Sequence, residues 1–207
     1  MATVAQDSTT IRRLRLGVGI VGIALPFVVT IGHMLHTGKI ELPNSISGAY
    51  HTNMRDVFVG SLSAVGVFLI FYRYSRWDDI LSTIAGVAAI AVALFPTSPG
   101  ATDLMASAAT TSSGKIHAVA ATVLFLSLAA FCFFLFPRSK KVRNAIYYVC
   151  GTLIVLGLGL ALLGSRILPD DIEDAVRPLF WGETVAILAF GVAWFTKSNT
   201  LMPDVET

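Results

Sequence analysis

Residues 116–136 read IHAVAATVLFLSLAAFCFFLF, a run that contains no Asp, Glu, Lys or Arg. A bilayer hydrocarbon core about 30 Å thick needs roughly 20 apolar helical residues, so this run is long enough to cross it. The rest of the chain holds more apolar runs of similar length, namely Leu16–Leu35, Val57–Tyr72, Ile80–Phe95, Ala145–Leu163 and Leu179–Phe195. The sequence therefore predicts an all-α fold, a polytopic membrane helix bundle with six transmembrane helices.

The composition agrees with a membrane bundle. Hydrophobic residues make up 55% of the chain, charged residues make up only 14%, and the mean hydropathy is +0.73. An average soluble domain has about 25% charged residues, so a soluble fold is excluded. The first run is longer than the apolar part of a signal peptide and has no small-residue cleavage site, so we expect it to be a span.

No linker or second domain interrupts the chain. We expect a cytoplasmic N-terminal tail over residues 1–15, one six-helix domain over residues 16–197 and a cytoplasmic C-terminal tail over residues 198–207. Cys132 and Cys150 fall inside spans, where cysteine behaves as a small apolar residue. The sequence predicts no disulfide.

Basic residues predict the orientation, because Lys and Arg in short loops favour the cytoplasmic side. Of the 15 basic residues, those expected on that side are Arg12, Arg13, Arg15, Arg73, Arg76, Arg138, Lys140, Lys141, Arg143 and Lys197. The other side keeps Lys39, Arg55, Lys115, Arg166 and Arg177. Both termini should therefore be cytoplasmic, in a multi-pass protein of the inner (plasma) membrane.

All four histidines map to the opposite, extracytoplasmic end of the predicted bundle: His33 and His36 end the first span, and His51 and His117 precede or begin two others. Glu183 lies five residues beyond Pro178, a typical first residue of a helix. Five helical residues correspond to about 7 to 8 Å of depth. An acid at membrane depth indicates a functional site.

From this placement we expect one polar cavity at the extracytoplasmic face. Its expected catalytic residues are His51, Asp56, His117 and Glu183. Its expected substrate contacts are Ser47, Arg55 and Trp181, with Arg55 holding a phosphate or carboxylate. Asp170 to Asp174, with Arg177, should form a solvated outer loop outside the site.

Each residue type also has an ordinary role at a membrane surface. His33 and His36 fit the headgroup level, and whether they belong to the site is left open. Arg55 fits a snorkelling cation, Asp56 an anion at a helix start, and Trp181 an interface anchor.

Four short stretches carry a resemblance to a known family. They are Leu94-Phe95-Pro96-Thr97 followed by Gly114-Lys115-Ile116-His117, then Trp181-Gly182-Glu183, and Ser45-Ile46-Ser47. The chain resembles a bacterial six-helix integral membrane family of unknown function. That family is distantly similar to six-helix membrane proteins of GPI-anchor remodelling and autophagy modulation. The resemblance implies a fold and the location of a site.

A second stretch, Ser47-Gly48-Ala49-Tyr50-His51 followed by Asp56, is similar to a motif of intramembrane zinc hydrolases of the alkaline ceramidase and adiponectin-receptor type. Those proteins add a His-xxx-His pair from a late helix, and this chain has none. The cofactor is left open: a site of His51, His117 and one carboxylate could still hold Zn²⁺ with an open position for water.

The sequence thus leaves several functions open and does not decide whether the protein is an enzyme. The first interpretation is a protein that handles a lipid or lipid-linked substrate. The alternatives are a metal-dependent intramembrane hydrolase, a small proton- or ion-coupled transporter or channel, and a haem protein with two histidine ligands. We expect membrane lipids and no nucleic acid as partners, and the sequence leaves a homo-oligomer open.

The orientation is directly testable. Cysteines introduced at Lys140 and Lys141 should react with a membrane-impermeant thiol reagent only after the cytoplasmic side is opened, because basic loops stay inside. Labelling of intact cells at these positions would invert the topology and move the histidines to the cytoplasmic face.

Overall fold

The computed structural model describes residues 2–101, 104, 111–137 and 141–198. Every regular element in these residues is helical. The long helices are α1 (Ala2–Thr37), α2 (Arg55–Ile70), α3 (Arg76–Leu94), α5 (Ser112–Ala130), α6 (Lys141–Ile167) and α8 (Pro178–Lys197). The short ones are the 3-10 helix η1 (Ser47–His51), the π-helical turn η2 (Phe131–Leu135) that continues α5, and α7 (Asp170–Val176). The all-α prediction is confirmed for this part of the chain.

Five of the described helices are long and apolar enough to cross a membrane: Thr9–Thr37, Arg76–Leu94, Ser112–Leu135, Lys141–Gly164 and Pro178–Lys197. They coincide with five of the six predicted spans, which supports a multi-pass membrane protein. The remaining predicted span coincides with α2, which has 16 residues. At 1.5 Å per residue α2 is about 24 Å long, somewhat shorter than the bilayer core.

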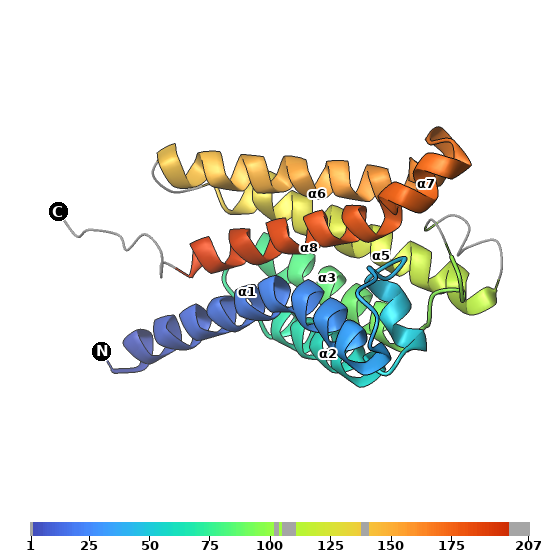
Figure 1. Ribbon diagram of the computed structural model, residues 1–207. Helices are drawn as coiled ribbons and strands as arrows, with labels where there is room; N and C mark the ends of the chain where they lie inside the picture. Colours follow the sequence, from blue (N-terminus) through green and yellow to red (C-terminus); the bar gives the residue numbers. More distant parts are fainter. Residues whose placement is uncertain (1, 102–103, 105–110, 138–140, 199–207) are drawn as a thin grey trace.

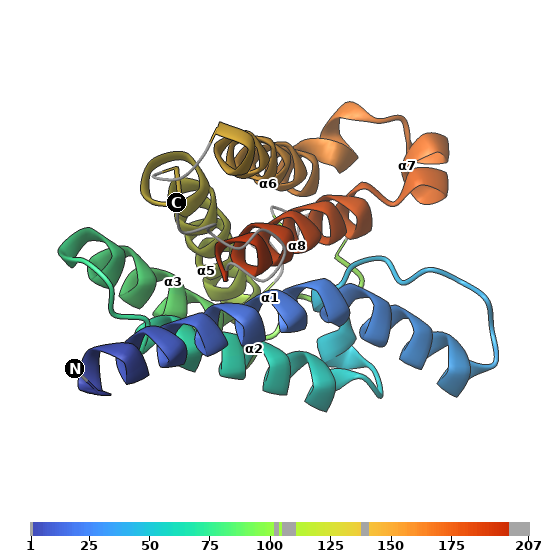
Figure 2. The same ribbon diagram turned by 90° about the vertical axis from the view of Figure 1, so that its left-hand side faces the viewer.

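The long helices run side by side, and successive packed pairs close into a ring (Figures 1 and 2). The order around the ring is α1, α2, α3, α5, α6, α8 and back to α1. In α8, 67% of the most apolar stretch is buried, a larger share than in the other four candidate spans. The buried fraction of α8 is therefore larger than that of the other candidate spans.

The two ends of the bundle differ in chemistry. The first residues of α1 and the last residues of α8 lie at the same end (Figure 1). We call it the basic end, because Arg15, Arg76 and Lys197 lie there. We call the opposite end, which carries the histidines, the histidine end. The predicted N-terminal tail is helical from Ala2 onward and continues into α1, whereas residues 199–207 of the predicted C-terminal tail lie outside the described residues.

The basic end is tied together by cation and aromatic contacts. Arg15 donates from Nη2 to the Tyr72 hydroxyl at 2.8 Å, and Lys197 donates from Nζ to the Phe136 carbonyl at 3.2 Å. The Trp194 ring lies edge-on to Tyr72 and Phe136, with centroid distances of 5.0 and 5.3 Å. These contacts connect α1 and α8 to the segments that follow α2 and η2, and so they brace the bundle far from the histidine end.

Glycine pairs set the distance between several helices. A Cβ on Gly157 of α6 would lie 2.6 Å from the Gly182 carbonyl oxygen of α8, and a Cβ on Gly182 would lie 2.6 Å from the Gly157 oxygen. Gly66 and Gly86 meet in the same way between α2 and α3. Small residues allow such close backbone contact between membrane helices, where the hydrophobic effect does not drive association. Gly182 in turn places the neighbouring Glu183 close to the bundle interior.

We expect Gly157→Ala to destabilise the bundle by about 1 to 3 kcal/mol, because the new methyl group would force α6 away from α8. Gly159→Ala is the matched control on the same helix, since a Cβ there meets nothing within 4 Å. Thermal unfolding in detergent would measure both. Equal midpoints for the two variants would show that the glycine contact does not limit the packing.

Candidate functional site

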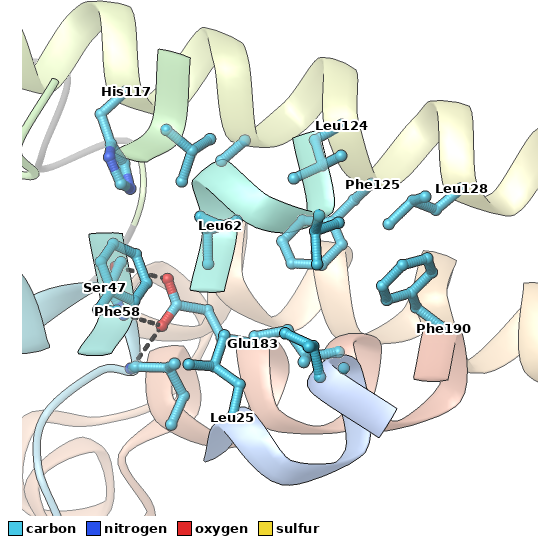
Figure 3. A pocket seen from close by; sticks show the side chains of 17 residues that line it. Leu25, Ser47, Phe58, Leu62, His117, Leu124, Phe125, Leu128, Glu183 and Phe190 are labelled. Atoms are coloured by element: carbon cyan, nitrogen blue, oxygen red, sulfur yellow. Dashed lines mark hydrogen bonds between the residues drawn. The ribbon is translucent and has the colours of Figure 1, made fainter. Parts of the chain in front are cut away.

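Glu183 is the buried acid of the histidine end. It lies in the second turn of α8, which begins at Pro178, and its side chain is only 4% exposed. Its Oε2 accepts hydrogen bonds from the backbone N–H groups of Ile46 and Ser47 at 2.6 and 3.0 Å, and its Oε1 accepts one from the Ser47 hydroxyl at 2.6 Å (Figure 3). All three groups are donors, so the arrangement suits an ionised carboxylate.

These bonds join α8 to the segment that leads into η1. Ile46 is the residue before η1, and no side chain of its own caps that helix. The first N–H groups of a helix lack intrahelical partners, and a carboxylate near them is favoured by the helix dipole. Glu183 therefore acts as the cap of η1 from a helix 136 residues further along the chain. Its burial is explained by these partners.

His117 is the second buried ionisable residue of this end. It lies in the second turn of α5 and is 1% exposed. Its Nδ1 lies 2.8 Å from the carbonyl oxygen of Phe95, the residue directly after α3. Its Nε2 is buried and has no hydrogen-bond partner among the described residues. A buried polar atom without a partner is unusual enough to need an explanation.

The Phe95 contact determines what the other ring nitrogen can do. A carbonyl oxygen only accepts hydrogen bonds, so Nδ1 of His117 must carry a proton. In a neutral imidazole the second nitrogen then has a lone pair and is an acceptor. Charge on a ring this buried would be costly, which favours the neutral form. His117 therefore has an acceptor, Nε2, that no described residue uses.

What lies beside it is an apolar cavity inside the helix ring (Figure 3). The cavity has a volume of about 60 Å³ and is lined by α1, the Ile46–Ser47 segment, α2, α3, α5 and α8. Of the 17 lining residues, three have polar side chains: Ser47, His117 and Glu183. On α5 the lining runs from His117 to Leu128, which at 1.5 Å per residue is about 16 Å of depth. The cavity is thus narrow and deep, with its polar groups at the histidine end.

The structure brings together only part of the predicted site. His117, Glu183 and Ser47 border the same cavity. Asp56, which we expected to point into the bundle, is exposed and is not among the cavity residues. The reason is its helical position, since Phe58 and Leu62 form the buried face of α2 and Asp56 lies about 200° around the helix from Phe58.

The other predicted contacts lie outside the cavity. His51 is exposed, and its Nε2 lies 2.6 Å from the Thr97 carbonyl oxygen. The Arg55 guanidinium lies over the Tyr50 ring at 4.5 Å and donates to the Tyr50 hydroxyl at 2.9 Å. Trp181 is 44% exposed, as an interface anchor would be. None of the three borders the space next to His117.

The described residues contain no group of three or more His, Cys, Asp or Glu side chains that could hold a metal ion. In particular, His51, His117 and a carboxylate do not assemble as a zinc site there. Of the histidines, only His117 is among the cavity residues that the structure describes, so two histidines do not face each other across that space.

Comparisons of the chain with protein-family models, curated proteins and solved structures gave no match. The two resemblances seen in the sequence stay predictions.

Glu183→Ala should release the Ile46–Ser47 segment, because three donors would lose a buried acceptor. We expect a loss of about 2 to 4 kcal/mol and faster proteolysis within residues 39–54. Asp56→Asn, an exposed acid at the same end, is the control and should leave both unchanged. Hydrogen exchange of the Ile46 and Ser47 amides gives the direct measurement, and unchanged protection in the Ala variant would contradict the role of Glu183 as their acceptor.

Proposed function

We propose that the chain is an integral membrane protein with six spans and with both termini in the cytoplasm, in the plasma membrane. In this proposal α2 is the sixth span, supported by its place in the ring between α1 and α3. An even number of spans agrees with α1 beginning and α8 ending at the same end (Figure 1). The surplus of Lys and Arg assigned to that end supports a cytoplasmic location for it.

We further propose that the protein binds a lipid-like molecule with one apolar chain and a hydroxyl or carboxylic acid head. The observation that carries this proposal is the unpaired Nε2 of His117 at the polar end of an apolar cavity. Because Nε2 is an acceptor, the partner that it lacks is a hydrogen-bond donor. An O–H group at the end of a chain supplies that donor.

The shape of the cavity supports a thin ligand. The volume of the cavity is small for its length. Beyond the polar residues at the histidine end, its walls are aliphatic and aromatic, as at Leu62, Leu124 and Phe190. Water needs two or more polar partners to occupy a cavity stably, and this deeper part offers none from its lining side chains. A hydrocarbon chain needs no hydrogen bond from such walls, and it would have to widen the space of about 60 Å³ as it enters.

The polar end of the cavity is suited to hold the head group of the ligand. Glu183 is already satisfied by three donors, which leaves the His117 acceptor as the group that selects the ligand. A hydrogen bond to it is shielded from water. Hydrolysis and a proton relay, the alternatives from the sequence, have no separate observation in their favour.

The wall test uses two leucines of α5. Leu124 lines the cavity and is buried, whereas Leu126 on the same helix is 51% exposed and does not line it. Leu124→Phe should fill part of the cavity and weaken binding of a radiolabelled long-chain alcohol to protein in nanodiscs. Leu126→Phe should not. Equal binding by the two variants, with both folded, would overturn the cavity as the chain site.

The head test compares the long-chain alcohol with its methyl ether, which lacks the O–H donor. Wild-type protein should prefer the alcohol by about 3- to 10-fold, the value of one net hydrogen bond. His117→Asn retains a donor near the Nδ1 position and removes the Nε2 acceptor, so it should abolish the preference. His117→Gln retains an acceptor near Nε2 and should keep it. A wild-type protein without preference would contradict the proposed role of His117.

A further inference from the structure

A second pocket lies on the outer side of the Ser45–Gly48 segment. We call it the outer pocket; its volume is about 340 Å³. Ser45 and Gly48 line it, whereas Ile46 and Ser47 line the apolar cavity, so the two spaces share this short wall. Its other walls come from the end of α1, the coil before η1, the Ser98–Ala101 turn and the α7–α8 junction.

The outer pocket is lined by one Arg, one Glu and two His side chains. Those that the structure describes are Arg177, His33, His51 and Glu41. Arg177 is charged at all working pH values, and each histidine adds charge when it is protonated. Glu41 is the carboxylate among these lining residues, so its charge balances that of Arg177 while both histidines are neutral. Protonation of either histidine leaves a surplus of positive charge, which favours an anion over a cation in this space.

Arg177 carries the charged donor group of the outer pocket that has no partner in the described residues. It is half-buried at the junction of α7 and α8, and its backbone N–H closes α7 on the Glu173 carbonyl at 2.8 Å. Its backbone is left-handed, with φ of 51°, which is uncommon for a residue other than glycine. Its guanidinium forms no hydrogen bond or ion pair with the residues that the structure describes. A fork of five N–H donors therefore borders a polar space without a partner.

Other polar residues line the same pocket. His33 is one of them, and Asn44 adds an amide side chain. Ser98, whose hydroxyl lies 3.1 Å from the Thr111 hydroxyl, also lines the pocket. These groups come from parts of the chain far apart in sequence, which the fold gathers at one place.

We propose that the outer pocket binds an anionic phosphate or carboxylate group, with Arg177 as its charged donor and His33 and His51 beside it. The site is distinct from the apolar cavity and does not depend on the function proposed for that cavity. Arg177 takes the role that the sequence had assigned to Arg55. The reason is geometric, since Arg55 is exposed and engaged with Tyr50 while Arg177 borders the pocket.

The test measures binding of two probes to the full-length protein in detergent. Inorganic phosphate represents a free anion, and short-chain phosphatidic acid represents a lipid headgroup, with short-chain phosphatidylcholine as the reference lipid. Calorimetry or the shift of the thermal unfolding midpoint gives the affinity. Binding of both probes would assign the pocket to a free anion, and binding of phosphatidic acid alone would assign it to a headgroup.

The variants separate the outer pocket from general charge. Arg177→Gln should weaken binding by about 10- to 100-fold, the effect of losing a charged hydrogen-bond donor. Arg55→Gln removes a cation from the same end outside the pocket and should bind as the wild type does. Glu41→Gln removes the opposing carboxylate from an exposed residue and should bind more tightly.

If Arg177→Gln fails to fold, Glu41→Gln still tests the charge of the outer pocket, because a substitution at an exposed residue leaves the core intact. Binding of neither probe to the wild type would overturn the proposal. So would equal weakening by Arg177→Gln and Arg55→Gln, or a Glu41→Gln variant that binds no more tightly than the wild type. A negative result in the alcohol-binding tests of the apolar cavity would not affect these outcomes, because phosphate and phosphatidic acid are expected to bind in the outer pocket.

Discussion

The histidine end depends on the hydrogen bonds between the Glu183 carboxylate and the Ile46–Ser47 backbone. A coil that crosses the end of a helix bundle has few regular hydrogen bonds of its own, so something must satisfy its buried N–H groups. Glu183 does this from within α8, where an unpaired charge would be costly. The carboxylate and the backbone N–H groups therefore satisfy each other, so neither is buried without a hydrogen-bond partner. The result is a fixed segment that separates an apolar interior from a polar exterior.

Close helix packing is the second condition for that geometry. Gly182, directly before Glu183, touches the backbone of α6 at Gly157, so α8 cannot move outward without losing this contact. At the far end, Arg15, Lys197 and the rings around Trp194 hold the same helix. The acid is thus carried by a helix fixed along its whole length. A side chain that must meet three donors benefits from such a rigid support.

Much of the helix content followed from the sequence, because bilayer thickness fixes the length of an apolar run. Depth was also predictable: Glu183 and His117 stand out as polar groups one or two turns inside a span. The sequence predicted less well which side of its helix a given side chain lies on. Asp56 could have been excluded by noting that Phe58, Leu62, Val65 and Leu69 define the buried face of α2. We assigned Arg177 to a solvated loop because acidic residues precede it in the sequence. Nothing in the sequence shows that it lines one pocket with His33 and His51.

The partners of the polar groups were beyond sequence reasoning for a physical reason. Glu183 and His117 bond to backbone groups of Ile46, Ser47 and Phe95, and every residue type except proline offers the same N–H and C=O groups. Such contacts leave no signature in residue identity. They do decide the chemistry, because the Phe95 carbonyl fixes which nitrogen of His117 carries the proton. Since Ser45–Gly48 forms a wall of both pockets, the Glu183 bonds that hold this segment also set the shape of both pockets.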